Sequence, residues 1–118
     1  MENFKVKDIA LASRGHLQIE WASQHMPVLN QIKKRFNKEE PFKDLTLGAC
    51  LHVTKETAVL VDAFLAGGAK VALCGSNPLS TQDNVAAVLA EREVDVFAGR
   101  AQTADEYYWC VERVIDHK

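Results

Sequence analysis

Apolar residues are spaced in two different ways along the chain, and the change falls near residue 45. Before it, apolar positions within residues 13–26 recur every three or four residues, as on one face of a helix. Pro27 ends that helix and suits the first turn of a second one, which we expect to run to about Phe36. The polar stretch 37–44 then predicts a loop. The apolar face of the first helix consists of Leu17, Trp21 and Ala22.

Beyond residue 45, short apolar runs alternate with longer segments of helical periodicity. The expected strands are 45–50, 70–74 and 94–97, and the expected helices are 54–66, 81–92 and 103–117. Thr103 and Glu106 have capping-box spacing at the start of the last helix. Gly67 and Gly68 follow the first of these helices, where a C-cap favours glycine.

This alternation predicts an α/β fold. Apolar strands joined by helical crossovers indicate a parallel sheet with helices on both faces. We therefore expect one three-layer, doubly wound domain of Rossmann-like or flavodoxin-like type, preceded by two amino-terminal helices. In such folds the carboxyl ends of the strands share one edge, where ligands bind near a change in strand order. The loops at that edge are 51–57, 75–83 and 98–103.

Composition and charge fit a single globular domain and argue against a nucleic-acid or membrane partner. The chain has 118 residues, of which 47% are hydrophobic and 25% are charged, and its net charge is -2. That charge is far from the basic balance of a nucleic-acid-binding domain. The basic run Lys33-Lys34-Arg35 predicts a solvated helix face. The sequence contains no signal-peptide core and no apolar segment of membrane-spanning length.

Three cysteines, Cys50, Cys74 and Cys110, form an odd set without a C-x-x-C pair. This argues against a disulfide framework or a zinc knuckle and favours a reducing, cytoplasmic setting. Cys50 and Cys74 end predicted strands, where a reactive thiol is one interpretation. Buried, inert cysteine is the favoured one.

Polar side chains are dense in the first loop of the predicted edge. Thr54 can cap the amide of Thr57, and Glu56 suits the positive end of the helix dipole. Helix capping and ligand binding explain these residues equally well. His52 beside them is more typical of a structural histidine than of a catalytic one.

The second loop offers the same two interpretations. Asn77-Pro78 favours a turn, and Ser80 and Asp83 have capping-box-like spacing. Four consecutive hydrogen-bonding side chains nevertheless exceed what one cap needs, so turn chemistry and a polar ligand remain equal alternatives. These four are Ser80, Thr81, Gln82 and Asp83.

Several sites are excluded by missing motifs. No G-x-G-x-x-G or G-x-x-x-x-G-K-[ST] follows a predicted strand, so we expect no NAD or ATP binding by these residues. No set of His, Cys, Asp and Glu has metal-ligand spacing, and G-x-S-x-G is absent.

With these motifs in view, the sequence resembles the adenosylhomocysteinase family from Val6 to its end. The sequence of residues 67–76 is more similar to archaeal and thermophilic members than to animal ones. The blocks that carry the resemblance are 7–12, 26–27, 50–60, 76–83 and 106–110, in the order of the family.

The resemblance implies reversible hydrolysis of S-adenosylhomocysteine to adenosine and homocysteine, with tightly held NAD oxidising and then reducing the ribose. Thr54, Glu56 and Thr57 match residues around the adenosyl group, where a carboxylate suits the exocyclic amine of adenine. His52 matches a histidine near the ribose, with a possible catalytic role. Residues 77–83 match the second wall, with Asn77, Ser80, Thr81, Gln82 and Asp83 supporting and positioning the substrate. An inosine analogue is the alternative ligand.

Family members are several hundred residues long, so the resemblance implies that residues 1–118 are part of the substrate-binding domain. The NAD-binding domain and the later catalytic residues of the family are absent from these residues. We expect the chain to be inactive alone, and to dimerise through an open sheet edge, whereas full-length family members form tetramers. The alternatives are a stand-alone nucleoside-binding or regulatory module and a receiver-like signalling domain. The latter needs acidic residues that Cys50-Leu51-His52 and Ala98-Gly99-Arg100 do not supply.

Overall fold

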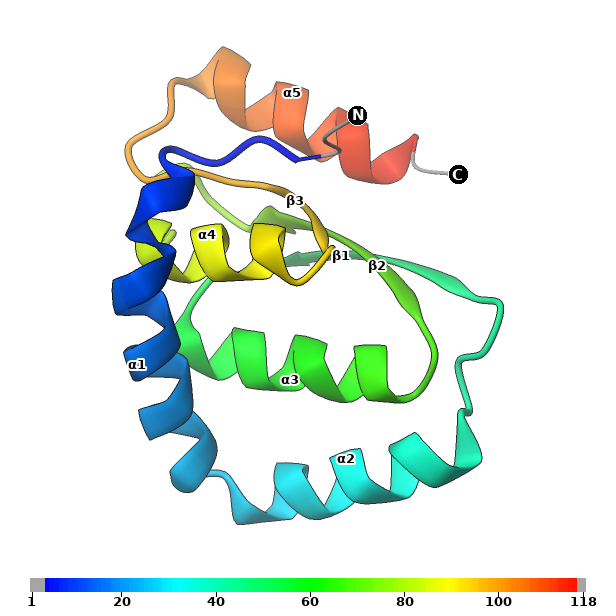
Figure 1. Cartoon of the computed structure of the whole chain (residues 1–118). Coiled ribbons are helices and arrows are strands. Elements are labelled where there is room, and N and C mark those ends of the chain that lie inside the picture. The colour runs from blue at the N-terminus through cyan, green and yellow to red at the C-terminus, as the bar shows by residue number, and fades with distance from the viewer. Residues whose placement is uncertain (1–3, 117–118) are drawn as a thin grey trace.

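Two helices begin the described chain and pack outside the α/β layers (Figure 1). The computed structural model describes residues 4–116. A short 3-10 turn, η1 (Ile9–Leu11), leads into α1 (Ala12–Gln24) and then α2 (Pro27–Glu39). Both helices predicted for this region are therefore present, and the η1 turn was not predicted.

The buried face of α1 differs from the face that its largest apolar residues predicted. Of the three apolar residues at helical spacing, Leu17 and Trp21 are 70% and 54% exposed, whereas Ala22 is buried. Small residues face inward because α1 lies very close to α4 (Asp83–Glu91). A Cβ atom on Gly15 would lie 2.1 Å from the carbonyl oxygen of Asn84. The buried residues of α1 are Ala12, Gly15, Ile19 and Ala22.

Helix α2 continues past Phe36 to Glu39, so the predicted loop at 37–44 is shorter than expected. Glu40 ends the helix in the left-handed region, with φ of 47°. Phe42 then packs edge-on against Phe36 at 5.3 Å and against Phe64 at 5.7 Å between ring centroids. These aromatic contacts fasten the α2 end to the helix that lies over the sheet.

The sheet contains three parallel strands in the order β1 (Thr46–Leu51), β2 (Lys70–Gly75) and β3 (Asp95–Phe97). Each boundary lies within one residue of its prediction. The strands lie side by side in the order in which they occur along the chain. The change in strand order that was expected near the ligand-binding edge is therefore not part of the described sheet. β2 and β3 are almost wholly buried, whereas β1 alternates between exposed and half-buried positions.

Helices cover both faces of the sheet, as a doubly wound fold requires (Figure 1). α3 (Lys55–Ala66) and α4 lie on one face, and α5 (Ala104–Ile115) lies across all three strands on the other. The three-layer, Rossmann-like α/β architecture is therefore confirmed. Gly67 forms the C-cap of α3, and Gly68 has a φ of 92° that favours glycine. The helix predicted at 103–117 is described to Ile115, and its predicted end at 117 lies outside the described residues.

The two edges of the sheet differ in whether another segment of the chain pairs with them. Residues before η1 add a bridge to β3, where the Lys5 amide donates to the Val96 carbonyl at 2.8 Å and the Ala98 amide donates to the Lys5 carbonyl at 3.0 Å. No strand in the described part of the chain pairs with the outer side of β1. The β1 edge therefore presents unpaired backbone groups.

The surface agrees with the sequence interpretation of the charged residues. Lys33, Lys34 and Arg35 are all exposed on α2, and Arg35 forms an i,i+4 ion pair with Glu39 at 3.0 Å. Within residues 4–116, no helix has the length and apolar character needed to cross a bilayer.

Candidate functional site

The loops after β1 and β2 are joined at the carboxyl edge of the sheet. The Ser76 amide donates to the carbonyl of Leu51 at 3.1 Å, and the Gln82 amide donates to the carbonyl of Val53 at 2.9 Å. In return, the Lys55 amide donates to the Gln82 side-chain oxygen at 3.1 Å. These reciprocal bonds fix the two loops as one polar surface.

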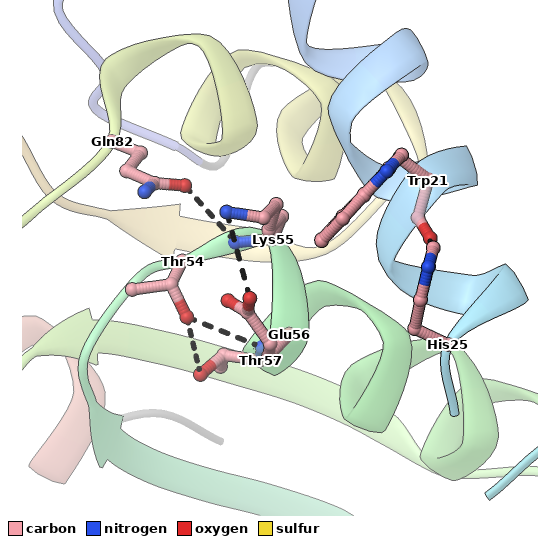
Figure 2. Close-up of polar contacts among 7 residues, drawn as sticks. All are labelled: Trp21, His25, Thr54, Lys55, Glu56, Thr57 and Gln82. Atoms are coloured by element: carbon pink, nitrogen blue, oxygen red, sulfur yellow. Dashed lines mark hydrogen bonds and ion pairs between the residues drawn. The ribbon is translucent and has the colours of Figure 1, made fainter.

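The first turn of α3 is held by its own hydroxyl groups (Figure 2). Thr54 is the N-cap, and its Oγ1 accepts a hydrogen bond from the Thr57 amide at 3.4 Å. The same hydroxyl donates to Thr57 Oγ1 at 3.3 Å. The predicted cap is therefore confirmed. It places the Thr57 hydroxyl in the first turn of α3, at the positive end of the helix dipole.

Glu56 extends from this turn with its side chain 51% exposed. Its Oε1 atom lies 3.5 Å from Lys55 Nζ, and that ammonium lies 5.5 Å from the centroid of the Trp21 ring. Trp21 in turn stacks on His25 at 4.2 Å between centroids. Figure 2 shows Trp21 reaching from α1 toward Lys55 at the start of α3. The exposed Glu56 carboxylate thus has a cation beside it, and that cation also lies near an aromatic ring.

His52 is oriented by the second loop. Asn77 Oδ1 accepts hydrogen bonds from the Leu79 and Ser80 amides, each at 2.8 Å, so its Nδ2 group points toward the imidazole. Asn77 Nδ2 lies 3.4 Å from His52 Nδ1, and Ser80 Oγ lies 2.8 Å from the same nitrogen. Because an amide nitrogen can only donate, Nδ1 acts as the acceptor and the neutral ring carries its proton on Nε2.

The rest of the second loop carries structural bonds. Asp83 Oδ1 accepts from the Arg100 amide at 2.9 Å, and its Oδ2 lies 3.9 Å from Lys7 Nζ. Asp83 therefore ties the third edge loop to the start of α4. The N-cap of α4 is Gln82, which makes no side-chain cap bond, so the capping-box interpretation of Ser80 and Asp83 was wrong. The predicted helix start at Thr81 was also two residues early, because residue 81 lies beneath the loop.

Thr81 is 1% exposed, and its hydroxyl and that of Ser76 are buried without hydrogen-bond partners among residues 4–116. Such groups are costly to leave unpaired. Their position places polar atoms under the loop that carries Asn77 and Ser80. The surface residues Asn77 and Ser80 therefore come from the same segment as the buried hydroxyls of Ser76 and Thr81.

Two hollows flank this surface. One, of about 360 Å³, lies between α1 and the start of α4 and is lined in part by Arg14, Gln82 and Arg100. The other, of about 350 Å³, lies between Trp21 and Lys55. Together with Glu56, the edge provides an acceptor, donors and an aromatic face, a combination suited to a polar heterocycle.

The described residues hold no group of three or more His, Cys, Asp and Glu side chains that would bind a metal ion. They also do not fit a dinucleotide. The loop between β1 and α3 contains no glycine, and the Thr54 hydroxyl already occupies the first-turn amide that a phosphate would use. The β1–α3 loop therefore does not form a pyrophosphate cradle.

Two residues near the predicted site residues, Trp21 and Lys55, were not predicted to belong to the site. Trp21 was counted on the apolar face of the first helix, and Lys55, which lies between Thr54 and Glu56, was not singled out. The available signal was the i,i+4 pair of Trp21 and His25, which places both rings on one side of α1.

The fold and the edge loops define a parallel α/β domain with a polar surface at the carboxyl edge of its sheet. Residues 3–118 match the family profile described as S-adenosyl-L-homocysteine hydrolase. The chain belongs to this family, as the sequence resemblance indicated.

Individual relatives agree with this assignment. The chain is 53% identical over 116 residues to an adenosylhomocysteinase of Sulfolobus acidocaldarius, covering 98% of this chain and 28% of the relative. It is 54% identical over 113 residues to the adenosylhomocysteinase of Saccharolobus solfataricus, covering 96% and 27%. It is 50% identical over 115 residues to an S-inosyl-L-homocysteine hydrolase of Methanocaldococcus jannaschii, covering 98% and 28%. The chain therefore spans little more than a quarter of the length of these curated relatives.

Proposed function

We propose that this chain supplies the nucleoside-binding wall of an enzyme that hydrolyses S-adenosylhomocysteine, or its inosyl analogue, to a nucleoside and homocysteine. The observation that carries the proposal is the exposed Glu56 carboxylate in the first turn of α3, next to Thr57 and at the same carboxyl edge as His52. A carboxylate accepts hydrogen bonds and therefore suits the exocyclic amine of adenine or the ring N–H of hypoxanthine. Membership of the hydrolase family supports the same assignment.

Each candidate residue has a distinct role in this proposal. Glu56 and Thr57 contact the base, with Thr54 holding their helix turn. His52 presents Nε2–H to the ribose, and Asn77 and Ser80 position its ring.

The remaining candidates act as supports for the pocket rather than as direct contacts. Gln82 bonds the Lys55 amide, Asp83 bonds the Arg100 amide, and Thr81 lies buried beneath them. We propose that these three fix the second wall at the correct distance from the first. Substrate positioning by this loop is then indirect.

NAD serves the family as a redox cofactor that oxidises and later reduces the sugar. Because residues 4–116 offer no pyrophosphate cradle, we propose that NAD is held by parts of the full-length protein beyond this chain. The isolated chain is then expected to be a cytoplasmic, catalytically inactive piece of the hydrolase. Incubation with S-adenosylhomocysteine and NAD should release no homocysteine thiol, and measurable release would overturn this expectation.

Binding of the base is tested by calorimetric titration of the chain with adenosine and inosine. We expect a dissociation constant of about 1 mM, equivalent to ~4 kcal/mol, because one wall of a pocket buries little of its ligand. Glu56→Gln removes the negative charge and should weaken binding about tenfold, or ~1.4 kcal/mol. Glu112→Gln on exposed α5 is the matched control and should bind like the parent. Equal affinity of both variants would refute the role of Glu56.

A further inference from the structure

We propose that Cys50 and Cys74 form a site of reversible oxidation, at which a peroxide converts the two thiols into an intramolecular disulfide between β1 and β2. This inference does not depend on the proposed function. It rests on the register of the sheet, the hollow that both thiols line and the difference in their exposure.

The two cysteines are direct partners in the parallel register of β1 and β2. Neighbouring strands lie about 4.8 Å apart, which falls within the range of roughly 4.4–6.8 Å that Cα atoms adopt across a disulfide. Both side chains are on the α5 face, where they line one hollow together with Val111 and Val114. A disulfide would therefore form without moving either strand from the sheet.

The thiols lie close together. Cys50 and Cys74 are cross-strand partners that line the same hollow, and Cys50 Sγ donates to the carbonyl of Gly75, the residue after Cys74, at 3.4 Å. Cys110 is the third thiol on this face, but it is 2% exposed and accepts from Gln102 Nε2 at 3.3 Å. The cross-strand pair is thus the one that both the shared hollow and the strand register favour.

Exposure sets the order of the reaction. Cys50 is exposed, which corrects its expected burial, whereas Cys74 is 1% exposed. Burial, reinforced by the neighbouring Cys50 thiol, raises the pKa of Cys74 to about 12. Cys50 is therefore the sulfur that meets the oxidant, and Cys74 is the resolving thiol.

The oxidation takes place in two steps. The Cys50 thiolate attacks one peroxide oxygen, so an S–O bond forms, the O–O bond breaks and hydroxide leaves, giving a sulfenic acid. The Cys74 sulfur then attacks Cys50 Sγ, so the S–S bond forms while the S–O bond breaks. The departing hydroxide takes up the proton of the Cys74 thiol and leaves as water. Two thiols and one hydrogen peroxide yield one disulfide and two waters, and an external dithiol reverses the change.

The location gives the disulfide a structural consequence. Cys50 lies two residues before His52, and Cys74 lies two residues before Ser76. The new bond would join the bases of the two loops that form the candidate site. Oxidation of this pair would therefore restrict how far the two loops can move apart.

The test is oxidation of the purified native chain with hydrogen peroxide, followed by alkylation of remaining thiols and intact-mass analysis. We expect loss of two hydrogen atoms, one alkylated thiol per chain, and a Cys50–Cys74 linkage in the proteolytic peptide map. A dithiol reductant should restore three alkylated thiols. Linkage through Cys110, a disulfide between two chains, or sulfinic acid as the sole product would each overturn the proposal.

Matched variants separate the pair from the third cysteine. Cys110→Ser should still form the internal disulfide, whereas Cys74→Ser should leave Cys50 as a sulfenic acid that a dimedone-type probe labels. Circular dichroism of each variant checks that the sheet is intact. Internal linkage that survives Cys74→Ser would contradict the assigned partner.

Discussion

Thr54 and Thr103 begin their helices with side-chain caps, and the two caps differ in strength. Thr54 accepts a 3.4 Å bond from Thr57, while Thr103 and Glu106 complete a reciprocal capping box. Both pairs were predicted from residue type and spacing, because capping is local and depends on positions three residues apart. The conformations of His52 and Trp21 were not predictable in this way, because each is set by a contact from a distant segment.

The Thr54 cap should contribute measurably to stability. Thr54→Ala removes the acceptor for the Thr57 amide and is expected to lower the free energy of unfolding by about 1 kcal/mol. Thr54→Ser keeps the hydroxyl and should remain close to the parent. Urea denaturation followed by circular dichroism measures both, and an unchanged midpoint for the alanine variant would show that the cap is not used.

The capping box of α5 should make stability depend on pH. The Thr103 amide donates a hydrogen bond to the Glu106 carboxylate at 3.0 Å. This bond, together with a smaller contribution from the Thr103 hydroxyl, lowers the pKa of Glu106 below its ordinary value of 4.5. A lowered carboxyl pKa adds stability that is fully present above pH 4.5 and is lost as pH falls through the lowered value. The stability difference between the parent and Glu106→Gln should therefore be constant near neutral pH and shrink in acid. A difference that grows in acid would contradict this assignment.

Helices α1 and α4 pack closely against each other because Gly15 of α1 has no side chain at their contact. A Cβ on Gly15 would meet the Asn84 carbonyl oxygen at 2.1 Å and Val88 Cγ2 at 2.6 Å, so the two helices could not keep their distance. This packing is why the residues inside α1 are small. It also holds Trp21 on the outer side of α1, where the ring reaches Lys55.

Gly15→Ala should destabilise the domain although alanine is the better helix former. We expect a loss of roughly 1–3 kcal/mol from overpacking, which exceeds the helix-propensity gain of about 1 kcal/mol. Ser13→Ala, on the exposed side of the same helix, is the control and should change stability by less than about 0.5 kcal/mol. Thermal unfolding distinguishes them, and a stabilised Gly15→Ala variant would mean that the helices lie farther apart.

The sequence predicted every long helix and every strand of the described fold, because apolar periodicity and glycine or proline boundaries act locally. It misjudged α1, where Leu17 and Trp21 look like core residues but close packing admits only small ones. It also predicted Cys50 to be buried, because nothing in residues 45–50 marks β1 as an exposed edge. Both errors concern which surface an element buries, and that depends on distant neighbours.

At the scale of the whole molecule, the sheet has one covered edge and one open edge. Lys5 pairs with β3, whereas the outer side of β1 lies beside exposed Leu45 and Ile115, which are 51% and 78% exposed. An open edge flanked by apolar side chains favours pairing with another strand. We propose that the isolated chain dimerises there.

Light scattering coupled to size-exclusion chromatography, under reducing conditions, measures this association. The parent should show a dimer whose fraction rises with concentration, and Leu45→Lys should shift it toward monomer because an edge charge opposes pairing. Lys70→Arg, at an exposed position of β2, keeps its charge and should behave like the parent. A clean monomer of the parent at high concentration would contradict edge pairing.

If the carboxyl edge of the sheet is a nucleoside-binding wall, adenosine should bind there and nowhere else on the chain. Backbone amide chemical shifts of the isotope-labelled chain should be followed during titration with adenosine to millimolar concentration. We expect the shift changes to gather at residues 52–57 and 76–83, with little change on α2 or α5. Saturating shifts centred on another surface, or no shifts at those two loops, would contradict it.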